Sequence, residues 1–203
     1  MIISLRHKTG NEQGGRKMER KEALALLTKY NESESLLKHA YSVEAVMRHF
    51  AKMNEEDEAY WGNVGLLHDL DYEKYPEMHC VKTREILEGE QAEEPFIRAI
   101  ESHGYGICTE VKPESYMEKV LYTIDELTGL ITATVLMRPD KNIQNLEVKS
   151  VLKKFKTAKF AAGVNREVVL KGCEMIDMDL SDVIRHTIEG MQAVSDDLGF
   201  SGQ

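Results

Sequence analysis

The sequence has few cysteines and no long hydrophobic run. Its three cysteines, Cys80, Cys108 and Cys173, are odd in number and lack the close paired spacing of a zinc ribbon or a redox motif. We therefore expect reduced thiols in a reducing compartment. No apolar run approaches the roughly 20 residues that span a bilayer, and the N-terminus lacks the apolar core of about 7–15 residues found in signal peptides. These absences predict a cytoplasmic protein with no membrane partner.

Positive charge is also scarce. The chain has 26 Lys and Arg residues against 35 Asp and Glu residues, a formal net charge of -9. Such a molecule presents no electrostatic footprint for duplex nucleic acid, so we expect no duplex nucleic-acid partner. A small anionic substrate would have to be attracted locally, by a metal ion or by a basic patch.

What the sequence does contain suits one folded domain. Its 203 residues are 42% hydrophobic and 30% charged, with only 4 Pro, a balance typical of a globular protein. Residues 1–17 are polar and contain three of the glycines. We interpret 1–17 as a flexible extension, or as an upstream start before a natural initiator at Met18, and 18–203 as the domain.

Apolar residues recur at helical spacing along almost the whole domain, which predicts an all-α fold. Asn54 precedes a run of acids and is expected to cap a helix, and Pro113 and Pro139 bracket the longest helix. Gly62 and Gly65 are expected to let one helix pack closely against another. The predicted helices span residues 19–30, 34–53, 55–70, 77–89, 93–103, 114–137, 146–158, 164–176 and 180–198.

Several ionisable residues lie on the apolar faces of these predicted helices. His39 shares a stripe with Val43 and Val46, and Asp125 shares one with Leu121. An ionisable group on a buried stripe carries a desolvation cost unless it is paired or bound to a metal. Five predicted helices thus direct metal-ligand side chains toward the interior: His39, His68, Asp69, His79, His103 and Asp125.

A lone histidine on an apolar face is more often a hydrogen-bonded core residue than a ligand. The whole set is harder to explain that way, because each unpaired buried polar group costs about 1–3 kcal/mol. A shared metal cluster removes the cost, and nitrogen and oxygen donors suit divalent iron, manganese, nickel, cobalt or zinc. The other histidines, His7, His49 and His186, are interpreted as solvated or edge residues.

The segment Leu66-Leu67-His68-Asp69-Leu70-Asp71 resembles the adjacent His-Asp signature of the HD superfamily of metal-dependent phosphohydrolases. His39 on an earlier helix and Asp125 on a later one stand in the ligand order of that family. His79 and His103 lie where its two-metal members place further ligands. The resemblance covers roughly residues 34–137 and implies a single HD-type helical domain.

The resemblance also implies roles. His39, His68, Asp69 and Asp125 would hold one ion, and Asp69 would bridge to a second ion held by His79 and His103. Asp69 and His68 would be the catalytic pair, and a metal-bound water would be the nucleophile. Two departures concern details: Tyr72 stands where many two-metal relatives have a lysine, and Gly104 stands where some have another histidine.

Residues 150–166 form the one basic stretch of this acidic protein. Lys153, Lys154 and Arg166 are candidate substrate-binding residues, and an arginine can form a bidentate fork with a phosphate. The alternative is a solvated helix face. Three acids lie next to proposed ligands in the sequence: Asp71, Glu101 and Glu126. We expect each either to orient a ligand or shuttle a proton, or simply to be exposed to solvent.

Three functions remain open from the sequence. The first is hydrolysis of a phosphomonoester or phosphodiester, of a nucleotide or a small metabolite, with two divalent ions as cofactors. The second is an oxygenase of the same fold with a two-iron site. The third is a non-enzymatic metal-bound sensor or scaffold. A homo-oligomer is compatible with all three.

Overall fold

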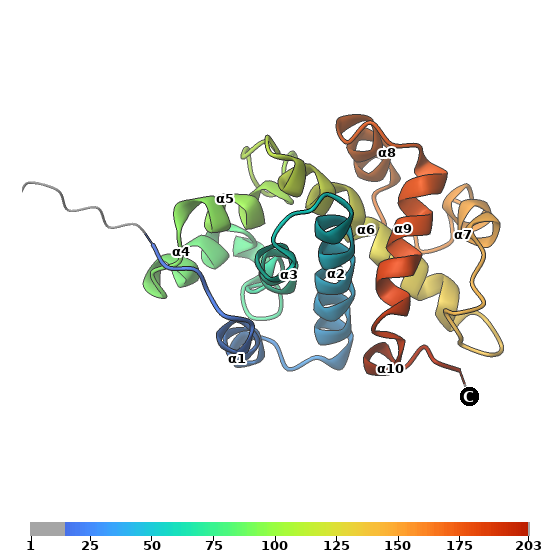
Figure 1. Cartoon of the computed structure of the whole chain (residues 1–203), viewed down its shortest axis with the longest axis horizontal. Coiled ribbons are helices and arrows are strands. Elements are labelled where there is room, and N and C mark those ends of the chain that lie inside the picture. Colours follow the sequence, from blue (N-terminus) through green and yellow to red (C-terminus); the bar gives the residue numbers. More distant parts are fainter. Residues whose placement is uncertain (1–14, 203) are drawn as a thin grey trace, which may run out of the picture.

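The computed structural model describes residues 15–202, and within them the secondary structure is helical with no β-strand (Figure 1). This confirms the predicted all-α fold class. The elements are α1 (Arg20–Tyr30), α2 (Glu34–Met53), α3 (Glu58–Leu67), the 3-10 helix η1 (Pro76–Met78), α4 (Val81–Gly89), α5 (Glu94–Ser102), α6 (Tyr116–Leu136), α7 (Val148–Phe155), α8 (Arg166–Met175), α9 (Leu180–Gln192) and α10 (Ser195–Leu198).

Helix α2 is the central element, and Figure 1 shows it between α3 and α9. Its apolar stripe is fully buried, and glycines on both neighbours let the backbones approach it. A Cβ at Gly65 of α3 would lie 2.9 Å from Met47 Cγ, and one at Gly190 of α9 would lie 2.8 Å from Val46 Cα. The expected close packing at Gly65 is confirmed. At both positions the backbones lie so close to α2 that a residue larger than glycine would displace the helix.

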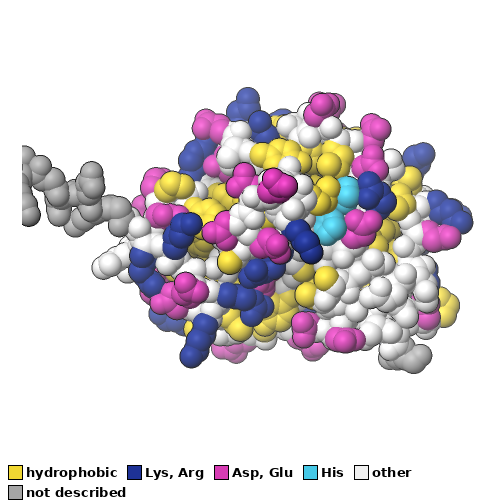
Figure 2. All heavy atoms as spheres, viewed as in Figure 1, with side chains coloured by type: hydrophobic (Ala, Val, Ile, Leu, Met, Phe, Trp, Pro, Cys, Tyr) yellow, Lys and Arg dark blue, Asp and Glu magenta, His cyan; other side chains and the backbone are white. Residues whose placement is uncertain are grey.

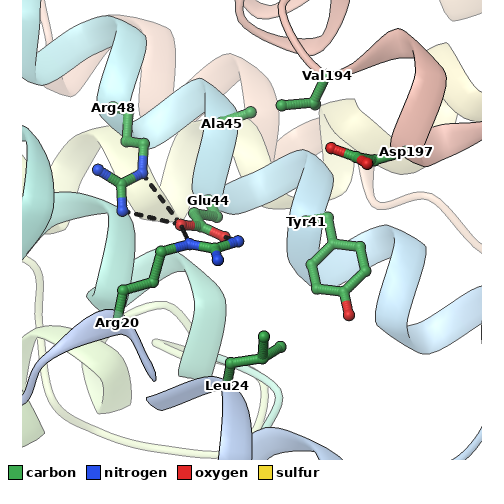
Figure 3. Close-up of a pocket in the computed structure, with 8 residues that line it drawn as sticks. All are labelled: Arg20, Leu24, Tyr41, Glu44, Ala45, Arg48, Val194 and Asp197. Atoms are coloured by element: carbon green, nitrogen blue, oxygen red, sulfur yellow. Dashed lines mark hydrogen bonds and ion pairs between the residues drawn. The ribbon is translucent and has the colours of Figure 1, made fainter. Parts of the chain in front are cut away.

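Helix α1 is tied to α2 by a buried carboxylate. Arg20 and Arg48 approach the Glu44 carboxylate from two sides, as Figure 3 shows. Arg20 Nε donates to Glu44 at 2.6 Å and Arg48 Nε donates at 3.0 Å, and the Glu44 side chain is only 5% exposed. Arg48 also donates to the Glu58 carbonyl at the start of α3. The cluster therefore connects three helices, and loss of either arginine would leave the buried Glu44 carboxylate with one ion-pair partner in place of two.

Helix α6 is the longest element and begins with a capping box. The Ser115 hydroxyl accepts from the Glu118 N–H at 3.2 Å, and the Glu118 carboxylate accepts from the Ser115 N–H at 3.0 Å. Pro113 and Pro139 lie just outside the two ends of the helix, as predicted. Because α6 packs against α2, α5, α7, α8 and α9, it brings Asp125 opposite the central helix.

The sequence predicts a helix over 55–70 capped by Asn54, but in the structure this helix is shorter and Asp57 caps it. Asn54 ends α2, where its side-chain amide donates to the Phe50 carbonyl at 2.7 Å. Glu55 has a φ of 57°, which breaks the helical path. Asp57 is the cap of α3, because its carboxylate accepts from the N–H groups of Ala59 and Tyr60, each at 3.0 Å.

The predicted helix at 77–89 is also interrupted. Pro76 opens a single 3-10 turn, and Cys80, with a φ of 68°, separates that turn from α4. His79 therefore lies between two elements rather than on a helix face, which corrects the expectation that five helices carry the ligand-type residues. His68 and His103 occupy the C-terminal caps of α3 and α5. The predicted helix at 180–198 is likewise divided, into α9 and α10.

Residues 15–17 contact the rest of the described chain: the Arg16 N–H donates to the Gln91 carbonyl, just after α4, at 2.9 Å. Met18 is buried, and its carbonyl accepts from Asn63 at 2.7 Å. Residues 1–14, with His7, lie outside the described residues. None of the described helices has the length and apolar character needed to cross a bilayer.

Candidate metal centre

The structure brings the six residues singled out above together in two groups. In the first group, His39 lies on α2, His68 and Asp69 follow α3, and Asp125 lies on α6. His39 Nε2 is 2.9 Å from Asp125 Oδ1 and 3.2 Å from His68 Nε2. His68 Nε2 is 3.3 Å from Asp125 Oδ1 and 3.4 Å from Asp69 Oδ2. Asp69 Oδ2 is 3.7 Å from His39 Nε2, so the four donor atoms enclose one small space.

The second group uses the other oxygen of Asp69. His79 Nε2 is 3.4 Å from Asp69 Oδ1, and His103 Nε2 is 3.6 Å from the same oxygen. The two imidazole nitrogens are 3.2 Å apart. These three atoms form a triangle, and the Asp69 carboxylate lies between it and the first group.

The ring orientation in the first group is set by hydrogen bonds on the far side of each imidazole. His68 Nδ1 donates to the Gly65 carbonyl at 2.7 Å. His39 Nδ1 faces the Thr128 hydroxyl at 3.3 Å, and that hydroxyl donates to the Asp125 carbonyl at 2.7 Å. Each Nδ1 therefore carries the proton, and each Nε2 presents a lone pair to the group.

The second group is oriented in the same way. His103 Nδ1 donates to the Ile100 carbonyl, one turn back in α5. His79 Nδ1 donates to Asp71 Oδ1 at 2.7 Å, and Asp71 Oδ2 accepts from the Thr83 N–H at 2.8 Å. Asp71 is buried, and it orients the ring of His79, which lies outside any helix. Of the roles predicted for Asp71, these contacts favour the orienting one.

The two carboxylates stay ionised in spite of burial. Burial opposes charge on Asp125, but the imidazoles of His68 and His39 outweigh it and hold the pKa of this carboxyl well below its usual range. Burial likewise opposes charge on Asp69, and the charge of His68 with the contact to His103 lowers its pKa. The pKa of His68 is raised, because the two carboxylates outweigh its burial. The cluster therefore attracts cations, and a bound cation would displace a proton from His68.

A cavity of about 300 Å³ opens onto both groups. Among the described residues none of its lining side chains is lysine or arginine, so the protein itself offers no fixed cation to an anionic ligand there. Burial raises the pKa of Glu126, one of the lining acids, and its carboxylate accepts from the Asn165 N–H at 3.0 Å. The lining residues are His39, Asp69, Tyr72, His79, His103, Gly104, Ile107, Cys108, Asp125, Glu126, Gly129, Gly163 and Val168.

Tyr72, three residues after Asp69, gives the cavity an aromatic side chain. Its ring meets the His79 ring edge to face, with centroids 5.2 Å apart, and it lines the cavity. Tyr72 thus forms an aromatic, uncharged part of the cavity wall. Glu101, the third acid considered near the ligands, is paired instead with Arg84 at 2.7 and 2.6 Å.

Two cysteines at the site were not anticipated from the sequence, because 28 residues separate them. Cys80 Sγ lies close enough to His79 and His103 to share an ion with them, and it is 3.0 Å from Cys108 Sγ. Both are free thiols. The hydrogen bond from Cys80, together with the nearby histidines, lowers the pKa of Cys108 to about 6. A Cβ at Gly104 would lie 2.3 Å from Cys108 Sγ, so only glycine fits after His103.

Arg166 does not have the free guanidinium that phosphate binding needs. Its Nε donates to the Phe155 carbonyl at 2.9 Å, and its Nη1 donates to the Ala161 and Val164 carbonyls at 3.2 and 3.0 Å. Its Nη2 donates to the carbonyls of Thr157 and Phe160. All five N–H donors of the side chain are thus used on backbone carbonyls. Arg166 organises the loop between α7 and α8, which replaces the expected phosphate fork.

The two lysines of the basic stretch do not line the cavity either. Lys153 is exposed on α7, and Lys154 Nζ lies 4.3 Å from the centroid of the Phe160 ring. The segment reaches the cavity through Gly163, and through Val168 at the start of α8. Contact of the two lysines with a substrate remains a prediction, and the position of Lys153 favours the solvated-face interpretation for that residue.

In comparisons with known proteins, neither a family model nor a solved structure matches the chain. What the structure supports is that groups of histidine, aspartate and cysteine side chains around Asp69 could hold a metal ion.

Proposed function

We propose that this protein is a metal-dependent phosphohydrolase of the HD type, with two divalent ions sharing the Asp69 carboxylate. One observation carries the proposal: Asp69 directs Oδ2 to His39 and His68, and Oδ1 to His79 and His103. Bonds of about 2.0–2.2 Å to one ion place neighbouring donor atoms about 2.9–3.6 Å apart. The separations in both groups fall in or near that range.

Bound ions would supply a water nucleophile of lowered pKa and would neutralise charge on phosphoryl oxygens. The protein's own residues prepare the site for this role. The Nδ1 hydrogen bonds direct all four Nε2 atoms into the two groups, and the carboxylates of Asp69 and Asp125 would balance the charge of the cations. Burial raises the pKa of Glu126 at the cavity wall, which favours a role for this residue as the general acid that protonates the leaving oxygen of an ester.

The cavity limits the substrate class. Its volume of about 300 Å³ suits a small ligand, and Tyr72 gives one wall on which a planar group can rest. A phosphomonoester or phosphodiester of a nucleotide or a small metabolite fits this description. Because no lysine or arginine lines the described cavity, phosphate recognition would depend on the ions themselves.

That same lack of lining cations favours one alternative, an oxygenase with two irons in the same ligand set. A substrate of an oxygenase need not carry phosphate, so it would not require fixed positive charge. Anaerobic loading with iron, followed by measurement of oxygen consumption with candidate organic substrates, separates this activity from ester hydrolysis. Oxygen uptake without phosphate release would favour the oxygenase.

The proposal is tested by metal analysis of the purified protein together with a panel of phosphomonoesters and phosphodiesters. We expect bound divalent metal and phosphate release that chelation abolishes. Asp69→Asn keeps the size of the side chain but removes its charge, and it should lose both bound metal and turnover. Wild-type turnover in Asp69→Asn, or hydrolysis that persists after complete metal removal, would reject the proposed centre.

A further inference from the structure

A second cluster of metal-ligand side chains lies between α2 and α9, outside the centre described above. It consists of His49 on α2, and His186 and Glu189 on α9. The sequence predicts that both histidines are solvated or edge residues, and their side chains are 25% and 12% exposed, as at an edge position. Figure 2 shows histidine at the surface beside acidic and basic side chains, over the region where Figure 1 places α2 next to α9.

The three side chains direct one donor atom each to a common point. His49 Nε2 is 3.1 Å from His186 Nδ1 and 3.4 Å from Glu189 Oε2. His186 Nδ1 is 3.1 Å from the same Glu189 oxygen. Zinc bonds of about 2.0–2.1 Å in a tetrahedral site place ligand atoms about 3.4 Å apart. The triangle therefore matches one face of a zinc coordination shell.

Hydrogen bonds can join these three atoms, because one N–H on His186 Nδ1 can be shared between Glu189 Oε2 and His49 Nε2. A cation at the centre would instead accept a lone pair from each of the three donor atoms, which lie close enough together to hold one ion.

The two helices hold the cluster in place. Gly190, next to Glu189, lets α9 approach α2 so closely that a Cβ there would lie 2.8 Å from Val46 Cα. The His186 ring packs edge to face on Phe50, with centroids 5.8 Å apart. Arg185 contacts the other oxygen of Glu189 at 3.5 Å and leaves Oε2 directed at the histidines. Ligands on packed helices are already in position before an ion arrives.

We propose that His49, His186 and Glu189 form a separate binding site for zinc, with the fourth coordination position open to solvent. Two imidazoles and one carboxylate are a common zinc ligand set, and the 41% exposure of the Glu189 side chain leaves room for a water. His49 follows His39 by ten residues on α2, about 15 Å along the helix axis. The site is therefore independent of the proposed catalytic centre, and its ion would join α9 to the helix that carries His39.

The test compares zinc stoichiometry at saturating zinc in full-length protein and in three single variants: His49→Gln, His186→Gln and Glu189→Gln. Glutamine keeps polarity and similar volume but is a poor zinc ligand. Each variant should bind one zinc ion fewer than wild type, by equilibrium dialysis and elemental analysis. Glu174→Gln, at an exposed acid of α8, is the matched control and should keep the wild-type number. Circular dichroism of the zinc-free variants verifies the fold.

The same measurement in an Asp69→Asn background separates this site from the proposed catalytic centre. There one zinc ion should remain, and adding His186→Gln should remove it. Substitution with cobalt gives an independent readout, because a tetrahedral cobalt site absorbs visible light and the band should vanish in His186→Gln. Equal zinc numbers in wild type and the three folded variants would overturn the proposal, whatever the outcome for phosphatase activity.

Discussion

At the scale of single residues, the orientation of His79 depends on Asp71 more than on any helix. The Asp71 carboxylate joins His79 Nδ1 to the Thr83 N–H and is itself buried. A carboxylate in this position fixes the tautomer of a ligand histidine and increases its basicity. His39, by contrast, has only the Thr128 hydroxyl behind it. His79, which lies outside regular secondary structure, is therefore the proposed ligand whose orientation depends most on a single neighbouring side chain.

We therefore predict that Asp71→Asn weakens metal binding by about 10–100-fold, the range typical for lost orienting partners. Asparagine has a single, uncharged oxygen that can accept a hydrogen bond, so it cannot accept from both His79 and Thr83 as the Asp71 carboxylate does. Titration of the metal-free variant with manganese, followed by electron paramagnetic resonance of the free ion, measures the change. Asp177→Asn, at an exposed acid, is the control and should bind metal as wild type does. Equal affinity in both variants would contradict the orienting role.

Protonation gives a second prediction at this scale. Burial opposes charge on His79, but the hydrogen bond to Asp71 and the charge of Asp69 raise its pKa, and the pKa of His68 is raised too. Both imidazoles therefore keep protons above the ordinary value of about 6.5, and a metal ion must displace them. Metal affinity should keep rising with pH above that value.

The metal-free protein should show the opposite trend in stability. A group whose pKa is raised on folding stabilises the fold below its unfolded pKa, and that contribution is lost as pH rises through the folded pKa. Thermal unfolding of metal-free protein across neutral and mildly alkaline pH should therefore show a falling midpoint. Metal-loaded protein should not share this fall, and parallel pH profiles for both forms would contradict the assignment.

At the scale of elements, the loop between α7 and α8 is built around one side chain. Arg166 donates all its N–H groups to five carbonyls of residues 155–164, and two of these, at Thr157 and Ala161, also accept from backbone N–H groups. This loop brings Gly163 to the cavity. The basic stretch therefore contributes to the site through the shape of its backbone.

We predict that Arg166→Lys and Arg166→Gln both lower the free energy of unfolding by about 1–3 kcal/mol, because neither replacement can satisfy the carbonyls. Urea denaturation measures this loss. If Arg166 acted as a phosphate-binding charge, Arg166→Lys would keep most of the stability and would change mainly the KM for an ester substrate. Lys153→Gln, on the exposed face of α7, should change neither quantity.

The helices and the residues on their buried faces were readable from the sequence, because a period of 3.6 residues records which side faces the core. His39, His68 and Asp125 were found in this way. The breaks were not readable: the positive φ of Cys80 and the cap at Asp57 depend on local contacts that periodicity does not encode. The Cys80–Cys108 pair and the His49–His186 pair depend on how distant elements pack, so no spacing along the chain reveals them.

At the scale of the whole molecule, α2 connects both proposed metal sites. Its first half carries His39, its second half carries His49, and close packing on α3 and α9 leaves it little freedom to move. An ion between α2 and α9 would stabilise the folded state by binding it preferentially. Any count of ions in this protein must therefore separate the two sites.

The decisive prediction concerns the number of ions at the catalytic centre, measured in a His186→Gln background so that the site between α2 and α9 does not contribute. That protein should bind two manganese ions per chain at saturation. His79→Ala or His103→Ala added to it should leave one ion, held by His39, His68, Asp69 and Asp125, because the second group would lose one of its two imidazole donors. Ester hydrolysis should fall sharply in both variants, because a metal-activated water would lose one of the ions that lower its pKa. If the background protein binds a single ion, and neither replacement changes that number, His79 and His103 contact substrate or core instead and the two-metal arrangement is wrong.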